Sequence, residues 1–374
     1  MIRAVRTLLP MAADGVGPSY TCTQLVSAAH ESGTEIDVFV NRTRIQNPPD
    51  YVHTALPRAL SFLPYKPISK FLTRISETNF VDHFSDGEVS YFWPSVSLEM
   101  HAWAAKNGHP VVMEAINTTM KSAKALLDEA YDSLGLSPGH GITNERVLEE
   151  EEKLATANAV FAPSRNVEMA LAQGGHQDKV IPVSYGVDLQ IAAQSGEVKN
   201  QNGNVIFLFC GFGCVRKGLH TLLEAWRDMP RNAKLQIVGN VEPAIREKFS
   251  DQLDDDRIQI TGFTRDVARY YAGADVFVLP SLEEGDPLVT YEAAAFSLPI
   301  IATPAGGGRM GSETDGIMIV DKDSKDSLLN AMLSFHASEE LRVHRGLVAR
   351  KAVAGYDWKA VGAHRMKLLE SVLA

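Results

Sequence analysis

Short apolar runs and longer amphipathic stretches follow one another along most of the chain. Unbroken apolar runs at 159–162, 205–210 and 276–279 have the length of strands that are covered on both faces, and a further strand is expected at 36–40. Stretches with helical spacing separate these runs, so strand and helix alternate. The pattern therefore predicts an α/β protein built on parallel sheets.

The clearest βαβ unit begins with the apolar run at 276–279. A polar loop follows it, and Asp286 and Pro287 are suited to the N-cap and the first position of a helix. We expect this helix at 288–296 and the next buried strand at 299–303.

Two carboxylates mark this unit as a candidate binding site. Glu292 is the only charged residue of an otherwise apolar helix, and Glu284 lies in the loop before it. A buried carboxylate is costly unless a donor binds it, and the helix N-terminus at Leu288 and Val289 favours anions. Carboxylates for hydroxyl groups beside a phosphate site indicate a pocket for a sugar nucleotide. Alternatively, Glu292 reaches solvent and Glu284 is an ordinary loop charge.

The spacing of these residues resembles a known family. Glu284 and Glu292 match the E-x7-E segment of the retaining family-four glycosyltransferases, which have the GT-B fold. Further segments follow in the order of that family, strongly over 205–305 and more weakly in the first half: FCGFGCVRKGLHTLLEAW (209–226), LQIVGN (235–240), ITGF (260–263) and YYAGADVFVLPS (270–281).

The resemblance implies two Rossmann-like, doubly wound parallel-sheet domains that face a cleft. We expect an acceptor-side domain at 1–188, and the polar stretch 189–204 as the linker. A nucleotide-sugar-binding domain should occupy 205–355. The residues 356–374 should form a last helix that packs back on the first domain.

A glycine loop follows the first expected strand, at 2–9. Gly15 and Gly17 allow the backbone to approach a ligand closely, and Ser19 can cap the following helix. The same loop faces the cleft in GT-B transferases, although the residues by themselves also fit a tight turn.

A second glycine loop, GFGCVRKG, places Arg216 and Lys217 near the start of a helix. Two cations above a glycine-rich backbone can neutralise a diphosphate, but they also fit an exposed turn. The family commonly has an arginine where this chain has Phe212, and we expect Arg216 to replace it. Asp286 and Pro287 stand where Phe-Gly is common, which we expect to alter the choice of sugar.

The resemblance assigns roles to particular residues. Arg216, Lys217 and Glu284 are the candidate catalytic residues: the cations would stabilise the leaving diphosphate, and Glu284 would hold the sugar. Glu292 would bind the ribose hydroxyls, and Phe263 would lie in the base pocket. The remaining expected substrate-binding positions are Gly15, Gly17, Asp286, Pro287, Leu288 and Val289.

These roles predict transfer of a hexosyl-type group from a nucleotide sugar, such as a UDP- or GDP-sugar, to a hydroxyl with retention. Surface polysaccharide, glycolipid or related glycoconjugate synthesis would use such an enzyme. Three alternatives remain open, namely a nucleotide-sugar 2-epimerase of the same fold, a non-catalytic sugar-nucleotide-binding protein, and a glycogen- or sucrose-type synthase. We expect no cofactor and no metal, because Asp254–Asp256 and Asp321–Asp323 fit solvated or structural turns.

Composition and charge limit the location and the partners. The net charge of −10 argues against general nucleic-acid binding, and the three cysteines show neither metal nor redox spacing. A reducing, cytoplasmic compartment is expected, with no transmembrane span. The segment 42–74 is basic and amphipathic but broken by prolines. It fits either an irregular excursion packed on the domain or a contact with the inner membrane face and a lipid-linked or anionic acceptor. Glu114 ends an apolar strand and fits either a cleft-facing role or a solvated end.

Overall fold

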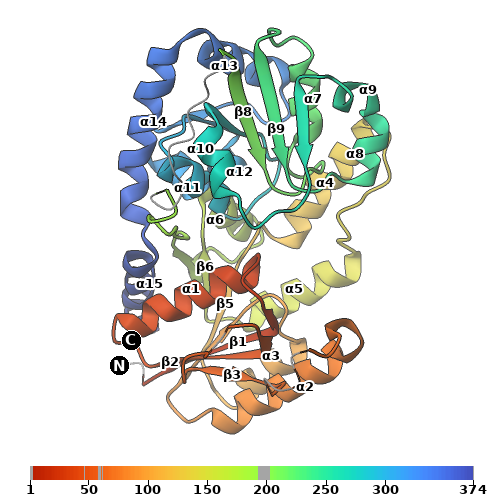
Figure 1. The fold of residues 1–374 in the computed structure, drawn as a ribbon. Helices are drawn as coiled ribbons and strands as arrows, with labels where there is room; N and C mark the ends of the chain where they lie inside the picture. The colour runs from red at the N-terminus through yellow and green to blue at the C-terminus, as the bar shows by residue number, and fades with distance from the viewer. Residues whose placement is uncertain (1–2, 46, 58–59, 61, 193–202, 374) are drawn as a thin grey trace.

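The computed structural model describes residues 3–45, 47–57, 60, 62–192 and 203–373. It contains two parallel sheets, one in each half of the chain, with helices on both faces of each sheet (Figure 1). The prediction of two doubly wound α/β domains is therefore confirmed.

The first sheet has seven strands in the order β3-β2-β1-β4-β5-β6-β7. Its strands are β1 Val5–Ala13, β2 Ile36–Thr43, β3 Val52–Thr54, β4 Val89–Phe92, β5 Val111–Glu114, β6 Ala159–Ala162 and β7 Val180–Pro182. The helices of this half are α1 Pro18–Glu31, α2 Tyr65–His83, α3 Leu98–Lys106, α4 Met120–Ser133, α5 Asn144–Thr156 and α6 Arg165–Gln173.

The second sheet has six strands in the order β10-β9-β8-β11-β12-β13. Its strands are β8 Val205–Cys210, β9 Ala233–Val238, β10 Ile258–Thr261, β11 Val276–Leu279, β12 Ile300–Ala302 and β13 Ile317–Ile319. The helices are α7 Leu219–Trp226, α8 Pro243–Lys248, α9 Ser250–Leu253, α10 Ala268–Gly273, α11 Leu288–Ala295, α12 Pro304–Glu313, α13 Lys325–Ala337, α14 Glu339–Val353 and α15 Trp358–Leu373.

The strands that are apolar throughout have the bounds that the sequence pattern predicts, because nearly all their side chains are buried. In β6, β8 and β11 every residue is buried except Ile206, which is partly covered. The first strand differs from its expected bounds, since β1 continues to Ala13. The pairing of β1 with β2 shifts register between Leu9 and Ala12, next to Pro10, which has no amide hydrogen for the ladder.

The helix α15 returns to the first half of the chain and packs along α1 (Figure 1). Trp358, Val361, Met366 and Leu369 of this helix belong to the apolar cluster that fills the first domain. Part of the expected linker, residues 193–202, lies outside the described residues, as does Arg58 of the basic segment.

The basic segment 42–74 is more regular than its prolines indicate. It contributes β3 to the edge of the sheet, and α2 starts at Tyr65 and continues to His83. Pro64 precedes this helix and Pro67 lies in its first turn, where a missing amide costs no intrahelical hydrogen bond. Among the helices of the described residues, none is long and apolar enough to cross a membrane.

Candidate active site

The candidate site lies where each sheet begins to add strands in the opposite direction. In the second sheet this point is between β8 and β11, and ligands of open parallel sheets bind outside the carboxyl ends there. The amide of Leu282 donates to the carbonyl of Arg216 at 2.8 Å. A Cβ on Gly218, whose φ is 68°, would lie 1.9 Å from the carbonyl oxygen of Pro280. The loops that follow β8 and β11 are therefore packed backbone against backbone.

A cluster of charges lies between these two loops. Lys217 Nζ is 2.5 Å from Glu284 Oε1, and Arg216 Nη1 is 3.0 Å from Glu284 Oε2. Burial by itself would raise the pKa of Glu284, but the neighbouring charges of Arg216 and Lys217 outweigh burial and lower that pKa to about 2. Glu284 is therefore ionised and forms ion pairs with both cations. The structure thus brings together the three residues that the sequence picked out as catalytic.

Glu292 is the second carboxylate of the predicted site, and it does not extend freely into solvent. It is partly covered, accepts a hydrogen bond from the hydroxyl of Tyr271 at 2.7 Å, and burial raises its pKa. Burial raises the pKa of Cys210 at the end of β8 and of Tyr20 in α1, and the charge of Glu292 adds to both increases. Glu292 therefore lies between the second sheet and the first domain, and Lys217 also acts on Cys210 from the same region.

Asp286 and Pro287 do not start α11 in the way that we expect from the sequence. Pro287 is itself the N-cap, with an extended backbone, and Asp286 precedes the cap. The Asp286 carboxylate accepts hydrogen bonds from the amide of Tyr185 at 2.8 Å, the amide of Arg309 at 2.9 Å and the hydroxyl of Tyr291. The capping prediction is wrong because buried donors bind this side chain. Asp286 instead joins the two domains.

The first turn of α11 lies between the domains. Leu288 packs against the apolar cluster of the first domain, whereas Val289 packs against that of the second. The first amides of a helix have no carbonyl acceptor within the helix. The backbone at Leu288 and Val289 thus remains a candidate for anion binding, with side chains that fix its position.

The glycine loop after β1 has the backbone that glycine permits. Gly15 and Gly17 have φ angles of 78° and 56°, and Gly17 is the N-cap of α1, with Pro18 in its first turn. Ser19 is already inside the helix, and its hydroxyl donates to the carbonyl of Val16 at 2.9 Å. The prediction that Ser19 caps this helix is therefore wrong, because Gly17 ends the loop two residues earlier.

Two aromatic residues stand exposed on the loops of the second domain. Phe263, after β10, is 63% exposed, and its amide donates to Asn240 Oδ1 at 3.3 Å. Phe212, at the position of the missing arginine, is 50% exposed. Phe212 and Arg216 both line a cavity that the first domain also lines. Arg216, which is on the same loop as Phe212, is therefore positioned to contact a ligand in this cavity.

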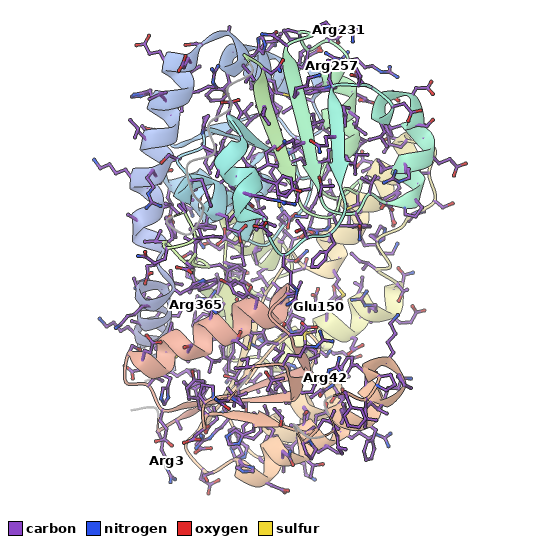
Figure 2. All side chains as sticks on the ribbon, viewed as in Figure 1. Arg3, Arg42, Glu150, Arg231, Arg257 and Arg365 are labelled. Atoms are coloured by element: carbon purple, nitrogen blue, oxygen red, sulfur yellow. The ribbon has the colours of Figure 1, made fainter. Side chains whose placement is uncertain are left out.

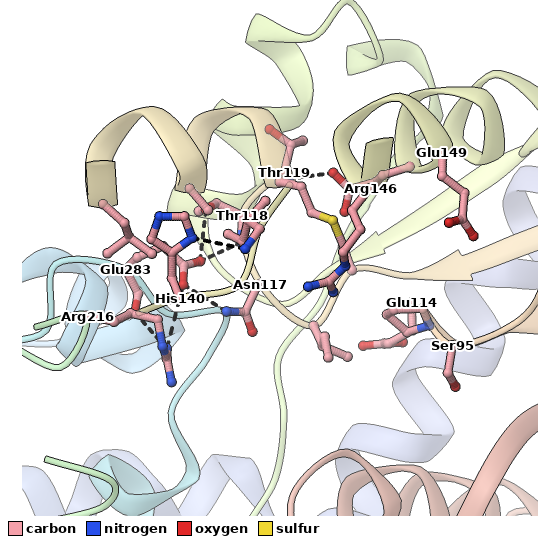
Figure 3. A pocket seen from close by; sticks show the side chains of 18 of the residues that line it. Ser95, Glu114, Asn117, Thr118, Thr119, His140, Arg146, Glu149, Arg216 and Glu283 are labelled. Carbon is pink, nitrogen blue, oxygen red and sulfur yellow. Dashed lines mark hydrogen bonds and ion pairs between the residues drawn. The ribbon is translucent and has the colours of Figure 1, made fainter. Parts of the chain in front are cut away.

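This interdomain cavity has a volume of about 640 Å³. Figure 3 shows Arg216 and Glu283 on one side of it, with Arg146, Glu149, Glu114 and Ser95 across from them. The first domain contributes the ends of β4 and β5, together with α4 and α5. No sequence pattern indicates α4 and α5 as walls of a site, because they meet the second domain only in the folded chain.

Glu283 is a residue of this region that the sequence reasoning missed. Its carboxylate accepts hydrogen bonds from Asn117 Nδ2 at 2.8 Å, the Thr118 amide at 2.9 Å and the Thr118 hydroxyl at 2.8 Å (Figure 3). A Cβ on Gly285 would lie 1.9 Å from the carbonyl oxygen of Ile116. Glu283 therefore fastens the Glu284 loop to the first domain. The adjacent pair of glutamates was the only signal in the sequence.

Glu114 is neither a solvated strand end nor a free ligand for a substrate. Arg365 of α15 donates to it from Nη1 and Nη2, at 2.8 and 3.1 Å, and the Tyr91 hydroxyl donates a further hydrogen bond. Both members of the ion pair are buried. Glu114 therefore holds the last helix against the first domain. Of the two alternatives for this residue, the solvated end is wrong, and Glu114 lies at the interdomain cavity.

The two acidic clusters near turns bind protein groups. Asp323 Oδ1 lies 3.2 Å from His220 Nε2 and accepts from the Thr221 hydroxyl at 3.1 Å, both on α7. Asp255 pairs with Arg257 at 2.6 Å, at the end of the second domain away from the first (Figure 2). Within the part of the chain that the structure describes, no three His, Cys, Asp or Glu side chains gather in a way that could hold a metal ion.

Comparison with known proteins bears on the second domain most directly. Residues 204–338 match the family described as Glycosyl transferases group 1. These residues include β8, the charge cluster and α11. The similarities place the chain among the glycosyltransferases.

Similarity to known glycosyltransferases extends over nearly the whole chain. A D-inositol 3-phosphate glycosyltransferase of Pseudarthrobacter chlorophenolicus is 25% identical, over 95% of this chain and 90% of its own length. A sucrose-phosphate synthase from Thermosynechococcus elongatus superposes with a TM-score of 0.72 at 19% identity, covering 99% of both chains. Anabaena HepE, solved with UDP and glucose, gives a TM-score of 0.66 at 14% identity, covering 98% of this chain and 99% of its own. These structures share the GT-B fold with this chain.

Proposed function

We propose that the protein transfers a hexosyl-type group from a nucleotide-diphosphate sugar to a hydroxyl acceptor, with retention at the anomeric carbon. The observation that carries this proposal is the partly buried cluster of Arg216, Lys217 and Glu284 beside the first turn of α11. The solved complexes of HepE with UDP and with UDP-glucose support a nucleotide sugar as the donor class.

The cluster explains how a diphosphate would be bound. Glu284 is now the counter-ion of both cations, at 2.5 and 3.0 Å. A donor diphosphate would take over Lys217 and Arg216 as partners, which frees Glu284 to accept hydrogen bonds from sugar hydroxyls. The two cations and the amides at Leu288 and Val289 would then stabilise the charge that grows on the leaving diphosphate.

Glu292 would accept hydrogen bonds from the ribose hydroxyls. Its pKa is raised by burial, and the Tyr271 hydroxyl already supplies one donor. Ribose hydroxyls would supply further donors to a carboxylate that has few of them, and this favours its ionised form. Phe263 would cover the base, and Gly15 and Gly17 would let the first domain close over the sugar. No side chain is assigned as a nucleophile, since a retaining transfer can use the leaving phosphate on the same face.

A thermal-shift panel of UDP-, GDP- and ADP-sugars tests the donor site, because a ligand that binds only the folded state raises Tm. We expect one base to stabilise the parent protein, and Lys217→Ala and Glu292→Ala to lose that shift. Lys325→Ala is the matched control, since Lys325 pairs with Asp228 on the surface. If both site variants respond to the donor like the parent, the donor site is assigned wrongly.

Product analysis separates the remaining alternatives. NMR of the product's anomeric proton should show the configuration of the donor sugar, and an inverted product would refute retention. Release of a C2 epimer without any acceptor would identify an epimerase, and donor binding without turnover would identify a binding protein.

We also propose that no metal is required. Loss of activity in EDTA that manganese restores would overturn this point.

We further propose that the protein is cytoplasmic and contacts the inner membrane face through the segment 42–74, beside an anionic or lipid-linked acceptor. The exposed side chains Lys66, Lys70 and Arg74 follow one another at four-residue spacing on α2. Phe62 and Phe71 are 78% and 66% exposed next to them. Basic residues with exposed aromatic side chains favour an anionic lipid surface.

Vesicle co-sedimentation tests this contact. We expect the parent protein to bind vesicles that contain phosphatidylglycerol and to lose this binding when Lys66, Lys70 and Arg74 are all replaced by Gln. The control replaces Arg231, Lys248 and Lys351, at other places on the protein surface. Equal vesicle binding by the parent and the α2 variant would refute the contact.

A further inference from the structure

The interdomain cavity has an apolar lining from five elements of the first domain. Met113 and Val160 come from β5 and β6, and Ala123, Leu127, Leu154 and Leu171 come from α4, α5 and α6. Its volume of about 640 Å³ is in the range of roughly 300–1,000 Å³ that small organic ligands occupy. The size and the lining therefore suit a ligand with a substantial apolar part.

Most charged groups around the cavity already have partners within the protein. Lys153 Nζ lies 2.5 Å from Glu149, and Glu114 is paired with Arg365. Glu150 accepts the Met120 amide at 2.5 Å, and burial raises the pKa of Glu150 to about 7. A polyhydroxylated sugar in this part of the cavity would find few free hydrogen-bond partners, because these groups already bind each other.

The cavity extends to the loop after β8, which carries the cations of the charge cluster. Phe212, Cys214 and Arg216 line it from the loop after β8, and Arg216 also contacts Glu284. A molecule whose apolar part lies among the helices could thus present a hydroxyl next to the sugar of a bound donor.

We propose that this cavity binds the acceptor, and that the acceptor carries an apolar body, such as an alkyl or aryl group, next to the hydroxyl that receives the sugar. The inference rests on the proposed function, because it names the acceptor class of that site. The binding of the acceptor to the cavity can be measured without a donor. The transferred sugar leaves the donor, its anomeric carbon bonds to the acceptor oxygen, and the acceptor proton passes to the leaving diphosphate.

Alkyl glucosides from methyl to octyl form a probe series with a constant headgroup, and calorimetry measures their affinity without donor. Each added methylene should tighten binding about fourfold until the cavity is filled, as converted from about 0.8 kcal/mol per buried methylene. Equal affinity of methyl and octyl glucoside, or no binding of either, would overturn the proposal. Tighter binding of inositol phosphate than of every alkyl glucoside would overturn it as well.

A pair of variants tests the location. Ile142 lines the cavity and is partly exposed, so Ile142→Asp should fold and should lose at least tenfold in octyl glucoside affinity. Leu148, which is 60% exposed, is absent from the cavity lining, and Leu148→Asp should bind like the parent. Equal affinity of both variants would refute this location. The thermal shift with the donor is measured on the same samples. If no donor shifts Tm but the affinity still rises along the alkyl glucoside series, only the donor site is refuted.

Discussion

Replacing Glu114 tests whether the buried pair with Arg365 is a structural tie between α15 and the first domain. Arg365 is 1% exposed, and both its terminal nitrogens contact the Glu114 carboxylate. In Glu114→Ala, Arg365 would keep its hydrogen bond to the Ser184 carbonyl at 3.1 Å and its positions over the rings of Phe161 and Tyr185. It would lose its only counter-ion within 4 Å among the described residues.

The expected cost follows from the burial of the cation that remains. Removing one partner of a buried ion pair costs about 3–5 kcal/mol, because the other charge stays uncompensated. In a unit of the size of the first domain, 1 kcal/mol corresponds to roughly 2–4 °C in Tm. We therefore expect Glu114→Ala to lower the unfolding transition by on the order of 10 °C. The double variant Glu114→Leu/Arg365→Met should recover most of this loss, since an apolar pair has no charge to solvate.

Urea denaturation followed by circular dichroism gives the free energy of unfolding, and a double-mutant cycle gives the coupling between the two residues. Glu152→Ala, at an exposed position of α5, serves as the control and should change stability by less than about 0.5 kcal/mol. A loss below about 1 kcal/mol in Glu114→Ala would refute the structural role. So would a double variant that is less stable than Glu114→Ala alone.

Three further predictions concern carboxylates between the domains. Glu283→Ala should lower kcat at least tenfold, and Glu283→Gln should lower it less, because Gln can still accept hydrogen bonds from Thr118; equal rates for parent and Ala variant would contradict this. The pKa of Glu150 is raised to about 7 in the folded protein. The free energy of unfolding should therefore fall by roughly 3 kcal/mol at most as the pH rises from about 4.5 to 7. Urea denaturation of Glu150→Gln should lack this fall. The lowered pKa of Glu284, about 2, contributes stability that is complete above about pH 4.5 and disappears as pH falls toward 2, so Glu284→Gln should flatten the acid limb of the stability curve; an unchanged acid limb would refute this.

The sequence carried much of the fold, because buried strands leave a local record. The runs at 159–162, 205–210 and 276–279 have the same bounds as β6, β8 and β11, since nearly every side chain in them is covered. The helix after Pro287 was also readable, but its cap was not. The role of Asp286 depends on the Tyr185 amide, which lies 101 positions earlier in the chain.

The candidate site was readable only in part, for the same reason. Spacing along one loop and one helix was enough to single out Glu284 and Glu292, and the glycine loop to single out Lys217. Glu283 escaped notice because its partners, Asn117 and Thr118, belong to the other domain. Nothing in the local pattern around Glu114 indicated that an arginine 251 positions later would neutralise it.

The sequence by itself determined which segments become buried strands and helices, because side-chain periodicity decides which face of each element leaves water. It also determined which loops carry the charges and glycines of a sugar-nucleotide site. Only the tertiary structure decided which carboxylates remain available to a ligand. Glu114, Asp286 and Glu283 are spent on contacts that connect distant parts of the chain, and a buried carboxylate takes whichever donors the assembled domains place within reach.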